Sequence, residues 1–385
     1  YMKKKVLFYQ FDQKEFLEKV GSYIEFDKNY HDIICKNEEE LILKLLEEEN
    51  REYSDSFYFK DTKNCERLYK KICNYNKKKE QPDNMISAAV IEALKEIVPA
   101  DKVLLQEPMK LHTTFRIGGP ADCLVYLENE EQLCKIQKYL RLVDVPYTVI
   151  GNGSNLLVSD QGYAGIVLVV GKHMSRIEVR DCYLEAEAGA LMSQVAKAAK
   201  EHGLTGLEFA AGIPGTIGGG AVMNAGAYDG EMSQVVTTVT VVNRNGEIME
   251  LDNSTMEYGY RTSVIQNQSF VVTKVTFRLQ PGDPEQIAAK MEELAIRRRE
   301  KQPLEYPSAG STFKRPEGHF AGQLIMEAGL RGYSVGGAKV SEKHCGFIIN
   351  TGNATAEDVK DVIWEVQRRV KERFHVELEP EIKFL

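Results

Sequence analysis

Apolar and polar residues follow two different periods along the chain from residue 85 onwards. Short apolar or alternating runs rich in β-branched residues are typical of strands, whereas apolar positions three and four residues apart are typical of helices. On this basis we predict strands at residues 123–127, 146–151, 165–170, 183–190, 235–243 and 269–279. We predict helices at residues 129–143, 191–203 and 283–303. The strand–helix–strand order at the start of this series predicts an α/β fold.

The distribution of glycine predicts the domain boundaries of this region. Strands lie on both sides of a long glycine-rich tract, which indicates one composite domain. The helix at 283–303 then opens a region with fewer glycines. We therefore predict one domain at residues 85–283, a second at 284–376, and a C-terminal segment at 377–385.

The first 84 residues differ in composition from the rest of the chain. Of the 30 glycines, only Gly21 lies before residue 85, and Pro82 is the only proline there. We predict strands at 4–11 and 23–26, helices at 37–50 and 62–75, and a charged linker at 76–84. These residues carry no recognisable chemistry. Two interpretations stay open: an appendage that docks a protein partner or the rest of the chain, and a passive extension.

Composition and charge exclude several classes of protein. The chain has 385 residues, of which 43% are hydrophobic and 28% charged, as in ordinary globular proteins. Its net charge of −8 predicts no nucleic-acid or anionic-membrane partner. No apolar run approaches the ~20 residues of a membrane span. The apolar stretch after Lys5 is broken by Gln10 and Asp12 without a cleavage site, so we expect a cytoplasmic protein without a signal peptide.

The cysteines and histidines predict neither disulfides nor a metal site. The seven cysteines are scattered without a C-x-x-C pair, and the seven histidines form no cluster with metal-ligand spacing, so we expect no metal. Cys345 follows His344, which suggests a catalytic Cys/His pair. Adjacent residues rarely face each other, so we expect a buried, inert cysteine instead.

Two glycine-rich loops are candidate binding sites. Residues 212–230, "GIPGTIGGGAVMNAGAYDG", hold seven glycines in nineteen positions, which lets the main chain lie against something flat and large. Residues 151–157, "GNGSNLL", follow a predicted strand, and their N–H groups either bind a phosphate or belong to an ordinary turn. Neither loop is followed by G-K-[ST], and Leu156 replaces the third glycine of a G-x-G-x-x-G motif.

Several longer motifs occur in a fixed order along residues 85–385. They are "TTFRIGGPAD" (113–122), "GNGSNLLVSD" (151–160), "GLEFAAGIPGTIGGGAVMNAGAYDGE" (206–231), "YRTS" (260–263), "SAGSTFKRP" (308–316), "KVSEKHCGFIINTGNATAEDV" (339–359) and the final "EPEIKFL". Together they closely resemble the UDP-N-acetylenolpyruvoylglucosamine reductase family. These flavoenzymes complete UDP-N-acetylmuramate for bacterial peptidoglycan, and so serve the cell wall, cell shape and cell division. Residues 1–84 fall outside the resemblance.

The resemblance implies a fold and a cofactor. The fold is α/β (α+β), with an FAD-binding domain of the vanillyl-alcohol-oxidase (PCMH) type in two parts and a C-terminal α+β substrate-binding domain. FAD is implied as a non-covalent cofactor, with its diphosphate at 151–155 and its rings against 212–230. The residues implied to bind FAD are Arg116, Gly118, Gly119, Gly151, Asn152, Gly153, Ser154, Asn155, Gly212, Pro214, Gly215, Gly218, Gly219, Asn224, Ala225 and Gly226.

The resemblance also implies a reaction. Hydride passes from NADPH to the flavin, and then to the β-carbon of the enolpyruvyl group of UDP-N-acetylglucosamine enolpyruvate. The α-carbon then needs a proton, and the developing charge needs stabilisation. The family pattern makes Ser311 the proton donor, Arg261 the partner of the substrate carboxylate, and Glu381 a charge-stabilising group that burial would keep protonated. Without the resemblance, these residues would be interpreted as a turn serine, a surface arginine and a solvated glutamate.

Implied substrate contacts are less closely tied to the motifs. They fall on Tyr228, Lys314, Gln323 and Asn350. Tyr228 is either a stacking residue or a packed aromatic, and Lys314 could assist Ser311. Arg315 stands where the family commonly has Asn, which either alters diphosphate contacts or has no effect. The segment 377–385 returns to the active site, and because relatives usually run a few residues longer, we expect Glu381 near a mobile end.

The sequence leaves two other functions open. One is a different flavin oxidoreductase of the same fold that oxidises an alcohol with O₂. The other is a flavoprotein scaffold that recruits wall-synthesis proteins through residues 1–84.

Overall fold

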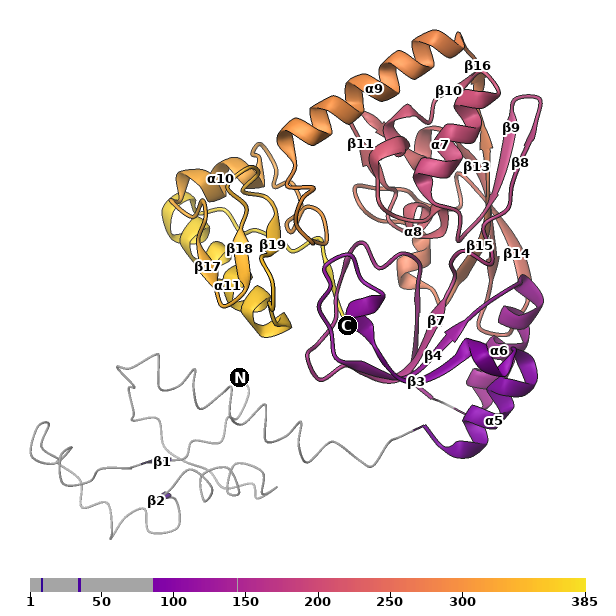
Figure 1. The fold of residues 1–385 in the computed structure, drawn as a ribbon, viewed down its shortest axis with the longest axis horizontal. Coiled ribbons are helices and arrows are strands. Elements are labelled where there is room, and N and C mark those ends of the chain that lie inside the picture. Colours follow the sequence, from indigo (N-terminus) through magenta and orange to yellow (C-terminus); the bar gives the residue numbers. More distant parts are fainter. Residues whose placement is uncertain (1–7, 10–33, 36–85, 144) are drawn as a thin grey trace, which may run out of the picture. The chain divides into compact units, whose positions relative to one another are not determined.

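The computed structural model describes residues 8–9, 34–35, 86–143 and 145–385, and the chain divides into two compact units, Tyr1–Asn84 and Met85–Leu385 (Figure 1). In the first unit, β1 (Phe8–Tyr9) pairs in parallel with β2 (Ile34–Cys35). β1 confirms the strand predicted at 4–11 for residues 8 and 9, and the rest of that strand lies outside the described residues. The predictions that lie outside the described residues are the strand at 23–26, the helices at 37–50 and 62–75 and the linker at 76–84.

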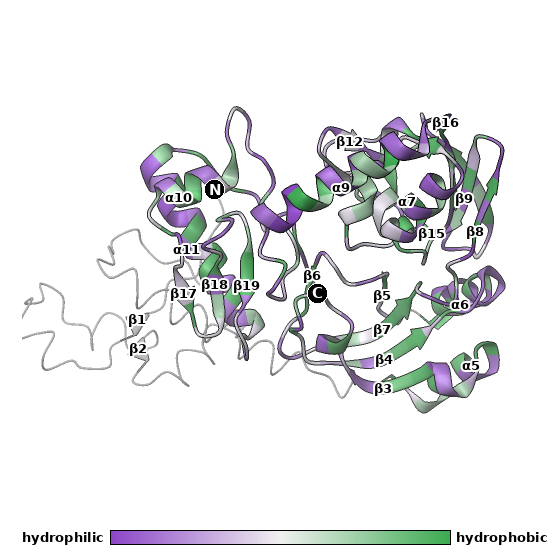
Figure 2. Ribbon diagram, turned by 45° about the horizontal axis from the view of Figure 1, so that its top comes forward, coloured by the Kyte–Doolittle hydropathy of each residue, from purple (hydrophilic) through white to green (hydrophobic). Residues whose placement is uncertain are grey.

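The second unit begins with a four-stranded sheet. Its order is β3 (Val103–Pro108), β4 (Pro120–Tyr126), β7 (Tyr163–Val169) and β5 (Tyr147–Ile150). β4 and β5 both run parallel to β7, and α6 (Glu130–Val143) is the crossover that such parallel strands require. Leu133 and Ile136 of α6 are buried in one core with Val125 and with residues of α5 (Ala88–Ile97). Figure 2 shows that these strands are mainly hydrophobic and that the helices have one hydrophobic and one hydrophilic face. The predicted strand–helix–strand unit is therefore confirmed.

A five-stranded antiparallel sheet follows. Its order is β14 (Ile248–Asp252), β13 (Val236–Val242), β15 (Val271–Arg278), β9 (Tyr183–Glu187) and β8 (Ile177–Arg180). Helices α7 (Met192–Glu201) and α8 (Ile217–Val222) pack against it (Figure 1). The buried Val239 of β13 and the buried Val275 and Phe277 of β15 explain why these two strands were predicted correctly, whereas β14 and β8 were not predicted.

The C-terminal part is a small sheet with helices. The long helix α9 (Pro284–Lys301) leads into it. Its strands are β17 (Ser334–Val335), β18 (Ala338–Val340) and β19 (Ile348–Asn350), and its helices are α10 (Ala321–Glu327) and α11 (Ala356–Phe374). Val340, Ile348 and Val366 share one buried cluster with Phe115 and Leu157 of the first part, so the two parts have a common core.

A carboxylate of the first part caps the longest helix of the C-terminal part. Asp160 accepts hydrogen bonds from the N–H groups of Ala356 at 2.8 Å and Glu357 at 3.1 Å. Thr355 and Asp358 add a capping box at the same helix end. An acidic side chain is favourable at a helix N-terminus because unpaired N–H groups and the helix dipole are positive there.

The C-terminal end of the chain is fixed as a strand. β20 (Lys383–Phe384) pairs in parallel with β6 (Leu156–Leu157), and Ser159 N–H donates to the Leu385 main-chain oxygen at 2.7 Å. The expectation of a mobile end near Glu381 is therefore wrong. The free ladder groups of β6 provide the hydrogen bonds that hold this segment.

Short elements complete the connections. They are η1 (Ala100–Lys102), η2 (Met109–Leu111), η3 (Glu208–Gly212), η4 (Met232–Gln234), η5 (Val264–Asn267), β10 (Leu204–Thr205) paired with β16 (Gln280–Pro281), and β11 (Gly226–Ala227) paired with β12 (Gly230–Glu231). The domain boundaries predicted at 283/284 and 376/377 stay predictions.

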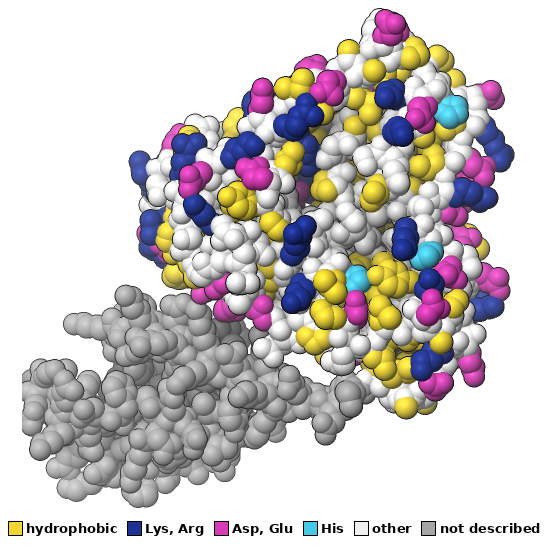
Figure 3. Space-filling model, viewed as in Figure 1, with side chains coloured by type: hydrophobic (Ala, Val, Ile, Leu, Met, Phe, Trp, Pro, Cys, Tyr) yellow, Lys and Arg dark blue, Asp and Glu magenta, His cyan; other side chains and the backbone are white. Residues whose placement is uncertain are grey.

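The described residues were compared with the features expected of membrane-spanning helices, metal sites and nucleic-acid-binding surfaces. Among the described helices, none is both long and apolar enough to cross a membrane. No three His, Cys, Asp or Glu side chains in the described ranges are grouped so that they could hold a metal ion. On the face shown in Figure 3, acidic and basic side chains are interspersed, unlike the continuous basic surface typical of nucleic-acid binding.

Candidate functional site

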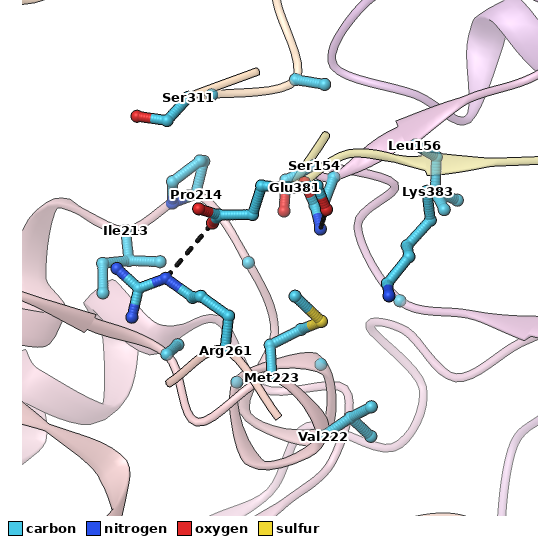
Figure 4. Close-up of a pocket in the computed structure, with 18 of the residues that line it drawn as sticks. Ser154, Leu156, Ile213, Pro214, Val222, Met223, Arg261, Ser311, Glu381 and Lys383 are labelled. Atoms are coloured by element: carbon cyan, nitrogen blue, oxygen red, sulfur yellow. Dashed lines mark hydrogen bonds and ion pairs between the residues drawn. The ribbon is translucent and has the colours of Figure 1, made fainter. Parts of the chain in front are cut away.

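A cleft with a volume of about 1640 Å³ is lined by loops from three regions: the four-stranded sheet, the five-stranded sheet and the C-terminal part. Figure 4 shows Ser311, Arg261 and Glu381 together in this cleft. They come from a loop of the C-terminal part, from the segment between β14 and β15, and from the C-terminal segment. The fold therefore brings together three residues that lie far apart in the sequence.

The 151–155 loop forms one wall of the cleft directly after β5. Gly153 has a φ of +59°, and a Cβ there would lie 2.0 Å from the main-chain oxygen of His112, so only glycine fits. None of the five N–H groups of 151–155 has a hydrogen-bond acceptor among the described residues. Successive free N–H groups in a turn form a concave site that suits an anion such as a diphosphate.

Residues 212–230 are called the glycine tract here, and those of them that form a second wall of the cleft lie between Ile213 and Ala227. Asn152 Nδ2 donates to the Pro214 main-chain oxygen at 2.5 Å and joins the tract to the 151–155 loop. At Gly215 an added Cβ would meet only Ser154 Oγ, at 3.4 Å, so this main chain is open to the cleft. At Gly218 a Cβ would lie 2.8 Å from Ala188 Cβ, so internal packing excludes a side chain there. The tract is therefore glycine-rich for two reasons, ligand approach and close packing.

Arg261 is fixed by main-chain oxygens of the glycine tract. Its Nη2 donates to Gly226 O at 2.8 Å and its Nη1 to Asn224 O at 3.4 Å. Its Nε donates to Glu381 Oε1 at 3.2 Å. The guanidinium is thus held in one orientation with its positive charge beside the Glu381 carboxyl group.

Glu381 is held through its main chain as well as its side chain. Its N–H donates to Thr312 O at 2.8 Å, and its main-chain oxygen accepts from Asn155 Nδ2 at 3.1 Å. Burial raises the pKa of the Glu381 carboxyl above its ordinary value, although the nearby Arg261 charge acts in the opposite direction. The raised pKa favours the protonated form that can donate a hydrogen bond.

Ser311 presents a free hydroxyl to the cleft. Its side chain is exposed, and among the described residues its Oγ has no hydrogen-bond partner. The next residue is fixed, because Thr312 N–H donates to Gly346 O at 2.8 Å and Thr312 O accepts from Glu381. Lys314 forms an ion pair with Glu379, so the assistance to Ser311 expected of Lys314 stays a prediction.

The structure separates the predicted site residues into two groups. Those that line the cleft are Gly151, Asn152, Gly153, Ser154, Asn155, Pro214, Gly215, Gly218, Gly219, Ala225, Gly226, Arg261, Ser311, Gln323 and Glu381. Those that do not are Arg116, Gly118, Gly119, Gly212, Asn224, Tyr228, Lys314 and Asn350.

Several residues of the second group have structural partners instead. Asn350 is buried, and its Nδ2 donates to Phe115 O at 3.1 Å. Asn224 is buried and donates to Gly259 O at 3.0 Å. The Arg297 guanidinium lies over the Tyr228 ring, with its Cζ 4.8 Å from the ring centroid. A Cβ at Gly119 would lie 2.2 Å from Asp160 O. Ligand contacts of these residues stay predictions.

His344 and Cys345 also line the cleft, but they do not form a catalytic pair. His344 Nδ1 accepts from Gly346 N–H at 3.1 Å, and burial lowers the pKa of its imidazole. Burial raises the pKa of the Cys345 thiol, which keeps it protonated and a poor nucleophile. This environment fits the inert cysteine expected from the sequence.

The sequence did not identify several cleft residues, among them Arg298 at the end of α9 and Gln302 just after it. The run "RRREKQP" at 297–303 was the available signal. Spacing alone does not show which of three consecutive arginines faces a ligand.

Comparison with known proteins gives consistent matches. Residues 302–385 match the family model "UDP-N-acetylenolpyruvoylglucosamine reductase, C-terminal domain", and residues 121–252 match the model "FAD binding domain". The chain is 52% identical over 296 residues to the UDP-N-acetylenolpyruvoylglucosamine reductase of Caldanaerobacter subterraneus subsp. tengcongensis, covering 77% of this chain and 98% of that protein. It is 50% identical over 292 residues to the reductase of that name from Clostridium perfringens, covering 76% and 96%.

A solved structure shows the same similarity. The crystal structure of UDP-N-acetylenolpyruvylglucosamine reductase from Thermus caldophilus superposes with a TM-score of 0.63 at 36% identity, covering 73% of this chain and 97% of that chain. Together with the FAD-binding domain model and the mixed sheet-and-helix architecture, this match confirms the predicted fold class.

Proposed function

The chain belongs to the UDP-N-acetylenolpyruvoylglucosamine reductase family, and we propose that it reduces UDP-N-acetylglucosamine enolpyruvate to UDP-N-acetylmuramate with NADPH as the reductant. The reaction is a step of peptidoglycan precursor synthesis, which we place in the cytoplasm. The observation that carries the proposal is the meeting of Ser311, Arg261 and Glu381 beside the 151–155 loop in one cleft. A protein partner of residues 1–84 stays a prediction.

The cleft fits non-covalent FAD. The free N–H groups of the 151–155 loop suit its diphosphate, and the open main chain at Gly215 suits a flat ring system. Neither 151–155 nor 212–230 contains a histidine or cysteine that could form a covalent link. When bound, FAD supplies the hydride chemistry between NADPH and the substrate, and the protein supplies geometry and charge.

Arg261 and Glu381 stabilise negative charge on the substrate. Hydride addition to the β-carbon leaves negative charge on the α-carbon, conjugated with the substrate carboxylate. Arg261 contributes a fixed positive charge, and Glu381 in its protonated form contributes a hydrogen-bond donor. Because burial raises the pKa of Glu381, the donor form is available at higher pH than for an exposed glutamate.

Ser311 delivers the proton to the α-carbon. Its Oγ is free of other hydrogen bonds, so the hydroxyl can turn towards the substrate. The hydrogen bonds of Thr312 fix the main chain beside it, which holds the donor on one face of the substrate. Proton transfer leaves Ser311 as an alkoxide, which the positive charge of Arg261 stabilises until water reprotonates it.

The test of this function is a sequential anaerobic titration of the purified protein followed by absorbance. Flavin bands should bleach with NADPH and return when UDP-N-acetylglucosamine enolpyruvate is added. Bleached bands that do not return would contradict the substrate and favour another flavin oxidoreductase of this fold. A protein without flavin bands that also takes up no FAD would contradict the proposal as a whole.

A further inference from the structure

Arg261 lies in a tight turn with a strained main chain. Gly259 and Thr262 form an isolated bridge, in which the N–H of each donates to the main-chain oxygen of the other, at 3.1 Å and 3.3 Å. Arg261 is the third residue of this four-residue turn and has a φ of +56°. A β-turn with a positive φ at this position normally has glycine there, because a side chain makes the left-handed conformation unfavourable. Other contacts therefore have to hold the turn.

Two amide side chains bind main-chain oxygens of this turn. Gln266 Nε2 donates to Arg261 O at 3.0 Å and to Val222 O, at the end of α8, at 3.1 Å. Asn224 Nδ2 donates to Gly259 O, at the start of the turn, at 3.0 Å. Gln266 thus ties the main chain of Arg261 to the glycine tract, whose main-chain oxygens also accept from the Arg261 guanidinium.

The amide of Gln266 uses its hydrogen-bonding groups within the protein. Its Nε2 has two hydrogens and faces two main-chain oxygens, with Met223 Sδ at 3.5 Å. Its Oε1 accepts from Lys383 Nζ at 3.4 Å. Turning the amide by 180° would place its oxygen against two carbonyl oxygens, so the orientation is fixed. Gln266 lines the cleft, but its amide has no donor left for a ligand.

The neighbours of Gln266 belong to the region of the proposed reaction. Figure 4 shows Val222, Met223 and Lys383 in the same close-up as Arg261 and Glu381. The Arg261 side chain is directed by bonds to main-chain oxygens of the glycine tract and to the Glu381 carboxyl. Its main chain is directed by Gln266. Both ends of this arginine are therefore held, as a charge with one fixed direction requires.

We propose that Gln266 is a positioning residue, which acts through Arg261 by holding its main chain in the left-handed conformation. This inference rests on the proposed function. Without the bond from Gln266, Arg261 can relax to a more favourable φ, and its side chain turns with the main chain. The cleft then keeps the positive charge but loses its direction. An oriented charge lowers the barrier because it already points to where negative charge develops on the substrate.

Asn224 holds the same turn but also supports the fold around it. It is buried, its own φ is +42°, and its Oδ1 accepts from Ser233 N–H at 3.0 Å. A substitution of Asn224 would disturb the glycine tract as well as Arg261. Gln266 is only partly buried, so it is the residue at which positioning is tested separately.

The experiment compares Gln266→Met, which removes the amide at similar size, with Gln266→Lys, whose ammonium group can still donate to both oxygens. Each protein is reduced with NADPH and mixed with saturating UDP-N-acetylglucosamine enolpyruvate. Return of the flavin bands should be about tenfold slower in Gln266→Met and close to wild type in Gln266→Lys. Reduction by NADPH should not change. Asn267→Leu is the matched control, because Asn267 is an exposed amide outside the cleft lining, and it should behave like the wild type.

A double-mutant cycle with Arg261→Lys tests whether Gln266 acts through Arg261. Adding Gln266→Met to Arg261→Lys should slow the return of the bands by less than about twofold, because the oriented guanidinium is already lost. A purely structural role of Gln266 would slow both backgrounds by the same factor. The cycle therefore separates positioning from a general loss of stability.

Three results would overturn the inference. The first is a wild-type rate in Gln266→Met, even if its thermal unfolding midpoint is lower. The second is the same loss of rate in both backgrounds of the cycle. The third is faster release of FAD from Gln266→Met on dilution with an unchanged rate, which would make Gln266 a cofactor contact.

A fourth variant covers the case in which Gln266→Met does not fold. Gln266→Glu keeps the shape of the side chain and, when ionised, has no donor for the two oxygens. It should be as slow as predicted for Gln266→Met, and a wild-type rate would overturn the inference. A wild-type protein whose flavin bands do not return with the sugar contradicts the proposed function instead.

Discussion

Asn155 Nδ2 donates a hydrogen bond to the main-chain oxygen of Glu381 at 3.1 Å. The main-chain oxygen of Asn155 also accepts from Lys383 N–H at 2.9 Å, so Asn155 holds the chain at Glu381 and two residues beyond it. The 151–155 loop, proposed to bind the cofactor diphosphate, is thus joined directly to the segment that carries the acid.

This contact predicts that Asn155→Ala weakens the reaction with the sugar more than it weakens FAD binding. The variant keeps the N–H groups of the loop and loses the bond to Glu381, which is worth about 1–3 kcal/mol when the freed group is buried. We expect about a tenfold slower reaction of the reduced enzyme with the sugar. Asn152→Ala is the matched control, because it loses a side-chain bond of the same loop to Pro214 instead. An equal loss of FAD from both variants would contradict this separation.

Glu381 predicts a pH dependence of activity. Because burial raises the pKa of its carboxyl, the protonated donor is lost only as the pH rises through that raised pKa. The rate with the sugar should therefore fall on the alkaline side of this pKa. Glu381→Gln, which stays neutral, should remove that limb of the pH profile. A limb that persists unchanged in the Gln variant would assign the titration to another group.

The same carboxyl predicts a pH dependence of stability. A folded-state pKa above the unfolded value means that the favourable, protonated state is fully present below the unfolded pKa and lost as the pH rises through the folded pKa. Relative to Glu381→Gln, the wild-type protein should therefore lose stability across this window and show a constant difference above it. Thermal unfolding of both proteins over a pH series measures this. If the wild-type protein instead gains stability relative to Glu381→Gln as the pH rises through this window, the pKa of Glu381 is lowered on folding and the prediction is wrong.

We predict that Arg261→Lys lowers activity although the positive charge is kept, because the planar guanidinium makes hydrogen bonds that an ammonium group cannot. A lysine cannot keep the bonds to Gly226 O and to Glu381 in the same orientation. We expect a loss of about 10²-fold in kcat, with FAD retained, as for removal of one oriented charge-stabilising donor. Steady-state kinetics and flavin absorbance together measure this. A lysine variant with wild-type kcat would show that the charge alone is sufficient.

We predict that Asp160→Ala lowers the free energy of unfolding and leaves the catalysed reaction unchanged. Removing the cap from the N-terminus of α11 should lower the free energy of unfolding by about 1–2 kcal/mol. Glu357→Ala is the control at the same helix end, because it loses only an exposed ion pair with Lys360 at 3.7 Å and should change stability by less than about 0.5 kcal/mol. Denaturant unfolding with flavin and helix signals measures both variants.

The sequence pattern predicted the elements whose apolar residues face a sheet core. The α6 and β13 segments are examples, because their spacing matches the period of the element. Helix α11 was not predicted, although its capping box at Thr355 and Asp358 is a start signal, since this stretch was interpreted only through its motif.

The candidate site was predictable only in part, for physical reasons. The motifs identified Ser311, Arg261 and Glu381, but the order of residues does not show that Asn155 positions Glu381. The glycine tract was interpreted as a ligand surface, whereas Gly230 is required by packing, because its Cβ would lie 2.6 Å from Phe209 Cδ1. Such distinctions depend on which atoms meet across the fold, and a linear pattern does not contain them.

The most direct test of Ser311 as the proton donor is the reaction of NADPH-reduced Ser311→Ala protein with UDP-N-acetylglucosamine enolpyruvate, followed by flavin absorbance after rapid mixing. Reduction by NADPH should be unchanged, because Ser311 takes no part in it. Return of the flavin bands should be about 10²–10⁴-fold slower than in the wild type, the usual contribution of a positioned proton donor. Ser308→Ala, in the same loop but outside the cleft lining, should behave like the wild type. Wild-type return of the bands in Ser311→Ala would contradict the assignment of Ser311 as the proton donor.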